Sequence, residues 1–165
     1  MLKKKISALC MLATICASSV CFASIPDSEL YIGGIGIGTT NQEVQTIYGD
    51  PWALTSQGKN HKLWKGEVKT YEYGKEKTYK IIFNDNKVIQ VYSKANNGLE
   101  TPAGLHVGLT KEDVLDFYGE PDIINEYNGK DKWFYASETN EHKGMAIVID
   151  NKTEKVKEIT VGLFE

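Results

Sequence analysis

The histidines are the first side chains to consider for chemistry, because imidazole binds metal ions and transfers protons near neutral pH. His61, His106 and His142 are widely separated, and none has an Asp or Glu partner at metal-ligand spacing. All three cysteines precede residue 24, in a segment that we predict to be removed. We therefore predict no metal site and no cofactor.

Two further motifs have an apparent likeness to ligand-binding loops. The glycine-rich stretch 33–38 cannot be written as G-x-G-x-x-G, and no Gly-Lys-Ser/Thr follows it, so we interpret it as a strand that leads into a helix. The stretches 84–86 and 150–152 carry Asn and Asp but lack the glycine and the final glutamate of a calcium loop. We predict hairpin turns at both.

Nucleophilic catalysis needs an activated side chain, and no serine after residue 23 lies in a Gly-x-Ser-x-Gly elbow. These serines are Ser24, Ser28, Ser56, Ser93 and Ser137. The carboxylates Glu112, Asp113 and Asp116 fit a solvated helix face and its cap better than an acid–base pair. We predict no catalytic residue and a non-enzymatic protein.

The amino terminus has the order of a secretory signal peptide. Lys3, Lys4 and Lys5 precede an apolar run, and the small-residue end at Ala23 predicts cleavage between Ala23 and Ser24. The apolar run is shorter than the about 17 to 25 residues that span a bilayer, so we expect no stable membrane insertion after cleavage. The predicted location is secreted or periplasmic.

Lipid attachment at Cys16 or Cys21 is the alternative for this segment, and it would place the protein in a lipid-anchored cell envelope. Ile15 and Val20 precede these cysteines, whereas lipid-acceptor cysteines usually follow a small residue. The lipidation state stays open.

The charge of the exported part disfavours nucleic acid as a partner. Removing Lys3, Lys4 and Lys5 from the 19 basic residues leaves 16 against 22 acidic ones, a formal charge of −6, and the chain has no arginine. Nucleic-acid binding depends on neutralising phosphates with basic side chains. We predict a protein partner and no nucleic acid.

Two segments about 70 residues apart match in register. Residues 38–51 and 108–121 share Gly, Thr, Val, Tyr, Gly and Pro at the same positions. Thr40 with Glu43, and Thr110 with Asp113, have the spacing of a capping box, so each segment predicts a short helix.

After each predicted helix, apolar side chains alternate with a period of two, which indicates antiparallel strands. We therefore predict an α+β fold of two tandem repeats, each a short N-terminal helical segment packed on a three- to four-stranded antiparallel sheet, joined in one curved sheet. The predicted boundaries are 1–23 for the signal peptide, 24–98 for the first repeat and 99–165 for the second.

These motifs resemble those of the β-lactamase-inhibitor-protein-like superfamily, which includes the small SmpA/OmlA lipoproteins of outer-membrane assembly. The best match is 107–121 together with Trp133-Phe134-Tyr135, and 37–51 matches more weakly. The resemblance implies a scaffold that binds through its surface. This chain differs in lacking the disulfides of the inhibitors and a good acceptor cysteine of the lipoproteins.

Aromatic side chains of the predicted strands are the candidate protein-binding residues: Tyr71, Tyr73, Trp133 and Tyr135. They either share an open sheet face, where aromatic residues often anchor partners, or pack under the helices as core. We predict an exported protein-binding module, with binding or inhibition of an exported enzyme as one form of that function. A cell-envelope structural or outer-membrane assembly component is the alternative.

Overall fold

The computed structural model describes residues 24–58 and 64–164, so the predicted signal peptide and the residue Ala23 of its cleavage site lie outside the described part of the chain. The helices are α1 (Asn41–Tyr48), α2 (Lys111–Tyr118) and a 3-10 helix, η1 (Asp27–Glu29). The strands are β1 (Tyr31–Ile32), β2 (Ile35–Gly36), β3 (Ala53–Gly58), β4 (Val68–Tyr73), β5 (Tyr79–Asn84), β6 (Lys87–Ser93), β7 (Ile123–Tyr127), β8 (Lys130–Ala136), β9 (Lys143–Asp150) and β10 (Lys155–Leu163).

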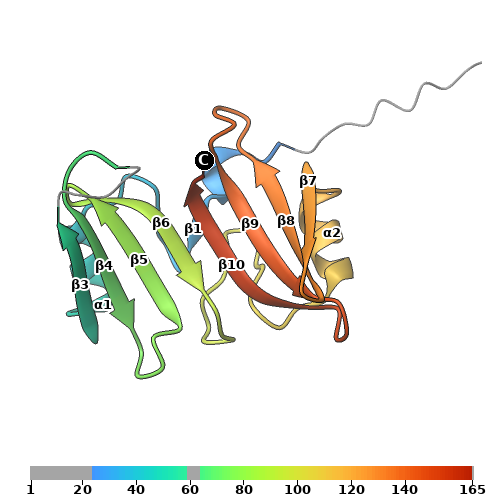
Figure 1. Ribbon diagram of the computed structural model, residues 1–165, viewed down its shortest axis with the longest axis horizontal. Helices are drawn as coiled ribbons and strands as arrows, with labels where there is room; N and C mark the ends of the chain where they lie inside the picture. Colours follow the sequence, from blue (N-terminus) through green and yellow to red (C-terminus); the bar gives the residue numbers. More distant parts are fainter. Residues whose placement is uncertain (1–23, 59–63, 165) are drawn as a thin grey trace, which may run out of the picture.

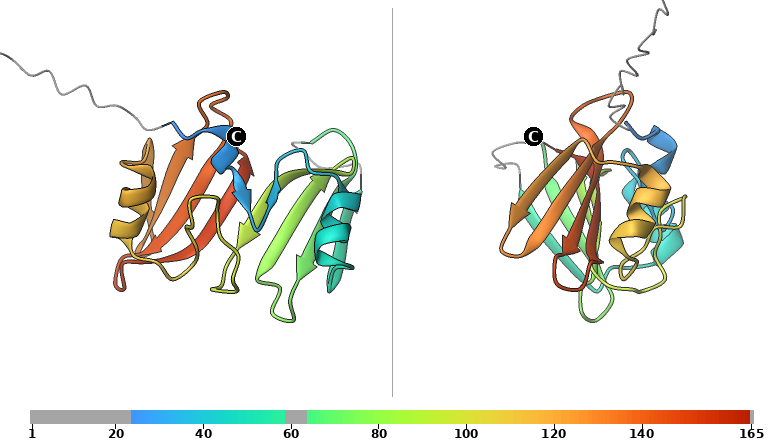
Figure 2. Two further views of the ribbon diagram at one scale, coloured as in Figure 1. Left: turned by 180° about the vertical axis from the view of Figure 1, so that it is seen from behind. Right: turned by 90° about the vertical axis from the view of Figure 1, so that its right-hand side faces the viewer.

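One eight-stranded antiparallel sheet dominates the molecule. Its strand order is β3-β4-β5-β6-β10-β9-β8-β7, and β1 and β2 form a separate two-stranded ribbon. Both helices and the ribbon lie on one side of the sheet, which we call the helix side; the other side is the open face (Figures 1 and 2). The predicted antiparallel strands are confirmed.

The two helices begin and end as the sequence indicates. Thr40 and Thr110 cap α1 and α2 with complete capping boxes, in which Glu43 and Asp113 accept from the backbone N–H of the cap residue. Val44 and Val114 are fully buried and hold the helices on the sheet. Eight residues are too few for a helix to persist in water alone, so each depends on this contact.

The sheet is continuous across its centre because β10 returns to pair with β6. Val161 lies opposite Val91, and Gly162 lies opposite Gln90. The Gln90 side-chain amide donates to the Leu163 carbonyl at 2.6 Å, directly beside this pairing. Gly162 has no room for a side chain, since an added Cβ would collide with Gln90.

The amino-terminal segment also ties the two halves of the sheet together. Ile25 donates a backbone hydrogen bond to the carbonyl of Ala136, the last residue of β8, while the Tyr79 hydroxyl of β5 donates to the Ile32 carbonyl at 2.9 Å. Asp27 accepts hydrogen bonds from Ser137 and Thr139 and forms an ion pair of 2.6 Å with Lys143.

The predicted fold class is therefore wrong. The described part of the chain is mostly β, with two eight-residue helices, an eight-stranded antiparallel sheet and a two-stranded ribbon, not an α+β pair of tandem helix-plus-sheet repeats. Local sequence signals predicted the helices correctly. The fold class depends instead on the pairing of β6 with β10, which joins all eight strands in one sheet, and on a single core that contains residues of both halves.

Candidate protein-binding site

The four aromatic residues predicted to bind a partner lie in the core on the helix side. Tyr71, Tyr73, Trp133 and Tyr135 are all buried, so their side chains form no exposed surface. This is the arrangement that the sequence had left as the alternative to an open binding face.

The two tyrosines at the helix ends have a structural role that explains their burial. The Tyr135 hydroxyl donates to the carbonyl of Gly119 at 2.9 Å, and the Tyr73 hydroxyl donates to the carbonyl of Gly49 at 3.3 Å. Burial raises the pKa of Tyr73 to about 12 and also raises the pKa of Tyr135, so both stay protonated as donors at neutral pH. They satisfy carbonyls that each helix leaves unpaired at its end.

Potential metal ligands and long apolar helices are two further features to consider in the described residues. Within 24–58 and 64–164, no group of three or more His, Cys, Asp or Glu side chains could hold a metal ion. In the same residues, no helix reaches the length and hydropathy needed to cross a bilayer. His106 has Nδ1 at 3.1 Å from the Val107 carbonyl, His142 lies exposed after β8, and His61 lies outside the described part.

The edge strand β7 is the most exposed apolar element of the sheet. All five of its residues are exposed, and Ile123, Ile124 and Tyr127 are 50%, 53% and 76% exposed. In the described part of the chain, β8 alone pairs with this strand, so no described strand forms hydrogen bonds with its outer edge. Natural edge strands often carry charged side chains, proline or a bulge that blocks further pairing. Strand β7 has one charged residue, Glu126, and within Ile123–Tyr127 it has no proline and no bulge. The outer edge of β7 has the features of a strand that accepts another strand.

Side chains of β7 alternate between the two faces of the sheet. Ile124 lies opposite Trp133, which is buried on the helix side, and Ile123 lies opposite Phe134, on the open face. Directly opposite residues of antiparallel strands share a face. A strand added to β7 would therefore meet an exposed isoleucine on each side.

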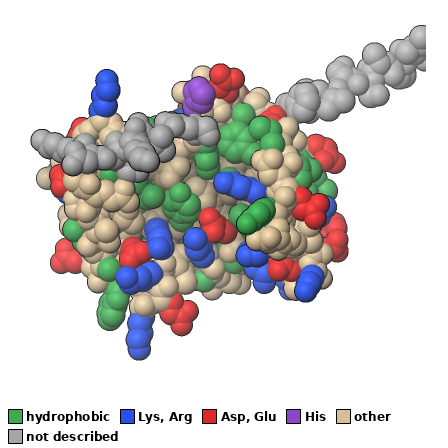
Figure 3. Space-filling model, viewed as in Figure 1, with side chains coloured by type: hydrophobic (Ala, Val, Ile, Leu, Met, Phe, Trp, Pro, Cys, Tyr) green, Lys and Arg blue, Asp and Glu red, His purple; other side chains and the backbone are tan. Residues whose placement is uncertain are grey.

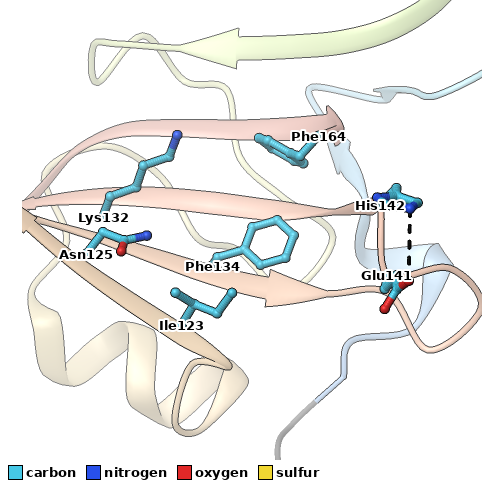
Figure 4. A pocket seen from close by; sticks show the side chains of 7 residues that line it. All are labelled: Ile123, Asn125, Lys132, Phe134, Glu141, His142 and Phe164. Atoms are coloured by element: carbon cyan, nitrogen blue, oxygen red, sulfur yellow. Dashed lines mark ion pairs between the residues drawn. The ribbon is translucent and has the colours of Figure 1, made fainter.

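The open face beside β7 is hollowed into a shallow groove of about 290 Å³. Its lining residues are Ile123, Asn125, Lys132, Phe134, Glu141, His142 and Phe164 (Figure 4). Phe134 and Phe164 meet edge to face with their ring centroids 5.2 Å apart. On this face, hydrophobic side chains gather in patches between charged ones (Figure 3).

Lys132 and the pair Glu141 and His142 give the groove a polar rim. The Lys132 ammonium lies 5.9 Å from the centre of the Phe164 ring, a distance at which the ring attracts the cation. Glu141 and His142 lie at the end of the groove away from Lys132 (Figure 4). The groove can therefore hold an apolar side chain with a polar group on either side of it.

On the helix side, the end of the sheet formed by β7 also has an exposed aromatic residue and a concentration of negative charge. Phe117, in the last turn of α2, is 42% exposed, and α2 is found at this outer end of the sheet (Figure 2). Residues 111–127 contain six carboxylates against one lysine. Four of them are exposed: Glu112, Asp116, Glu120 and Glu126. This end of the molecule attracts cations and repels other acidic surfaces.

Strand β7 was not predicted, although the sequence contains a signal for it. Asn128 and Gly129 both have positive φ angles, 51° and 71°, in the turn that joins β7 to β8. Asn-Gly between two β-prone runs is the strongest short-range indication of a hairpin. Apolar and polar residues alternate only weakly in 123–127, whereas the aromatic residues of β8 are conspicuous in the sequence.

Comparisons with known proteins show a likeness of fold alone. No family model matches the chain, and no curated protein matches it. An extracellular protein containing an SCP domain from Bacillus anthracis str. Ames is similar over 98% of this chain, with 14% identity and a TM-score of 0.53. A cysteine-rich secretory protein from Staphylococcus aureus subsp. aureus Mu50 is similar over 87%, with 14% identity and a TM-score of 0.55. The chain spans about half of each of these proteins, 50% and 49% of their lengths.

Proposed function

We propose that this protein is an exported, non-enzymatic binding module that takes an extended segment of a partner protein as an additional strand on β7. The observation that carries the proposal is an unpaired edge with two exposed isoleucines, Ile123 and Ile124, on opposite faces. Main-chain hydrogen bonds supply affinity in this mode of recognition, and pockets for alternate side chains supply specificity. The extracellular and secretory descriptions of the two structurally similar proteins agree with export.

The chemistry around β7 specifies the partner segment. On the open face, a residue opposite Ile123 meets the groove of Phe134 and Phe164 and should be apolar. On the helix side, a residue opposite Ile124 should also be apolar, and a residue opposite Glu126 should be basic. In the antiparallel orientation that the whole sheet uses, the partner then reads basic, any residue, apolar, apolar along its own chain.

A peptide-binding titration tests this proposal. The probe is a labelled, end-blocked peptide with the core Lys-Thr-Ile-Phe between threonines, and its matched control has the same composition in scrambled order. We expect Ile124→Lys to weaken binding of the probe at least about tenfold, since it removes the apolar contact with the peptide isoleucine and places a cation diagonally beside the peptide lysine, which lies opposite Glu126. Leu54→Lys, the same change at the other edge of the sheet, should leave peptide affinity unchanged.

The salt dependence of the same titration tests the electrostatic part. Attraction between exposed charges is screened over a Debye length of about 10 Å at 0.1 M salt and about 3 Å at 1 M, so the affinity should fall as salt rises. Equal binding of the scrambled peptide, or unchanged binding by Ile124→Lys, would overturn the proposal.

A further inference from the structure

The opposite edge of the sheet is formed by β3, which like β7 is a terminal strand of the sheet. Its pairing with β4 is regular over residues 53–56 and shifts register between Ser56 and Gly58, whereas the pairing of β7 with β8 is regular throughout. Trp52 is 64% exposed just before β3, and Leu54 is 56% exposed within it. Ile47, in the last turn of α1, is also exposed, as Phe117 is in α2. An exposed apolar helix residue and an exposed apolar edge-strand residue thus recur at both outer ends of the sheet, where α1 and α2 are found (Figure 2).

Leu54 points to the helix side, because it lies opposite the buried Tyr71. Within residues 24–58 and 64–164, β4 is the one strand that pairs with β3, and none of these residues forms a ladder with the outer edge of β3. The exposed leucine lies on the same side of the sheet as α1. A strand paired with β3 would therefore have apolar surface beside it on the helix side.

The two edges differ most in charge. Residues 41–58, which contain α1 and β3, have only Glu43 and Asp50 as charged residues, and β3 itself has none. Residues 111–127, at the β7 end, hold six carboxylates against one lysine. A second copy of the acidic end would be repelled, whereas two copies of the uncharged end meet without such a cost.

We propose that the β3 edge is a self-association surface, at which the regular part of β3, residues 53–56, pairs antiparallel with the same residues of a second copy across a two-fold axis. A two-fold axis perpendicular to the sheet keeps the helix sides of the two copies together, so the exposed Leu54 and Ile47 of both copies come to the same side. Ala53–Gly58 contains no charged residue. In any register in which two β3 strands pair, uncharged side chains therefore lie opposite uncharged ones. The pair buries both β3 edges and leaves a β7 edge free at each end.

Self-association at β3 is independent of peptide binding at β7, because it uses the other end of the sheet and a different occupant. The resulting dimer closes on itself: the pairing uses the same edge twice, so no third copy can join through β3. Two β7 edges then face outward in one particle. The β7 edges remain separately testable with the peptide described above.

The test is the mass of the purified protein in solution, measured by sedimentation velocity over a range of concentrations after expression of the full chain. We expect a concentration-dependent shift from one chain to two. Leu54→Lys should raise the dimer dissociation constant at least about tenfold, because two lysines would approach across the axis. Ile124→Lys, at the acidic edge, should leave the dimer unchanged.

A charge exchange separates loss of pairing from loss of folding. Leu54→Glu and Leu54→Lys should each be monomeric alone, and an equimolar mixture of the two should recover the two-chain mass. A monomeric wild-type protein at all concentrations would overturn the proposal. So would filaments of many chains that Ile124→Lys abolishes, since these would indicate head-to-tail pairing of β3 with β7. A mixture that stays monomeric would also refute it.

Discussion

Trp133 and Phe134 are consecutive residues on opposite sides of β8, so truncating them should affect different properties, the stability of the fold and the affinity for a peptide. The Trp133 side chain is 1% exposed on the helix side, with the Lys111 ammonium 5.1 Å from its ring centre. Phe134 is half-buried and lines the groove of the open face. We expect Trp133→Ala to lower the free energy of unfolding and Phe134→Ala to lower peptide affinity.

The magnitudes follow from burial. Truncating a fully buried tryptophan to alanine costs about 3–5 kcal/mol, because the apolar contacts are lost and a cavity remains. Full burial of a phenylalanine side chain stabilises a fold by about 1.5–3 kcal/mol. Because Phe134 is half-buried, Phe134→Ala should lower the free energy of unfolding by about 1 kcal/mol. Domains of this kind have about 5–15 kcal/mol of stability in all, so Trp133→Ala should leave the fold marginal.

Urea unfolding, with the probe peptide titrated in parallel, measures both effects. The expected outcome for Trp133→Ala is a large fall in the midpoint with a similar m value. Trp133→Phe is the milder control: the Trp133 Nε1 atom is buried with no hydrogen-bond partner among the described residues, so this change loses no hydrogen bond. If Trp133→Ala cost less than about 1 kcal/mol, or Phe134→Ala cost as much as Trp133→Ala, the placement of these two faces would be refuted.

Three further predictions concern the parts that hold the sheet together. Hydrogen bonds from Lys143, then from Ser137 and Thr139, lower the pKa of Asp27. The Asp27 carboxylate therefore stabilises the fold above the ordinary carboxyl pKa of about 3.9, and this contribution is lost as pH falls through the lower pKa of the folded state. Asp27→Asn should flatten the acid limb of a curve of unfolding free energy against pH, and an unchanged limb would contradict this. Gly162→Ala should lower the free energy of unfolding by about 1–3 kcal/mol, because the added methyl group collides with Gln90 where β6 meets β10; a neutral result in chemical denaturation would mean that this pairing is loose. Thr110→Ala should cost about 1 kcal/mol in the same measurement, because it removes the capping hydrogen bond at the start of α2.

Short-range features of the fold could be predicted from sequence. The capping boxes of Thr40 and Thr110 and the turn at 84–87 depend on side chains within a few residues of one another, so the sequence contains their full description. Alternation in 79–83 likewise indicated β5, because every second residue of that strand is buried.

The candidate site could not be found in the same way. Tyr73 and Tyr135 have the residue type of a binding hot spot, but their burial follows from the helices above them and not from their own sequence. The exposed edge at Ile124 exists because β7 is the last strand of the sheet and nothing further pairs with it in the described chain. Position in a sheet is a property of strand order, which residue type and spacing do not encode.

The sequence by itself thus determined the capped helices, the antiparallel strands and the acidic balance of the chain. Only the tertiary structure decided the fold class, since the pairing of Val91 with Val161 across β6 and β10 joins residues 70 positions apart into one sheet. It also decided which apolar residues are core and which are exposed, because burial depends on what packs against a side chain from elsewhere in the chain. Local chemistry sets the elements, and their long-range pairing sets the surfaces that remain for a partner.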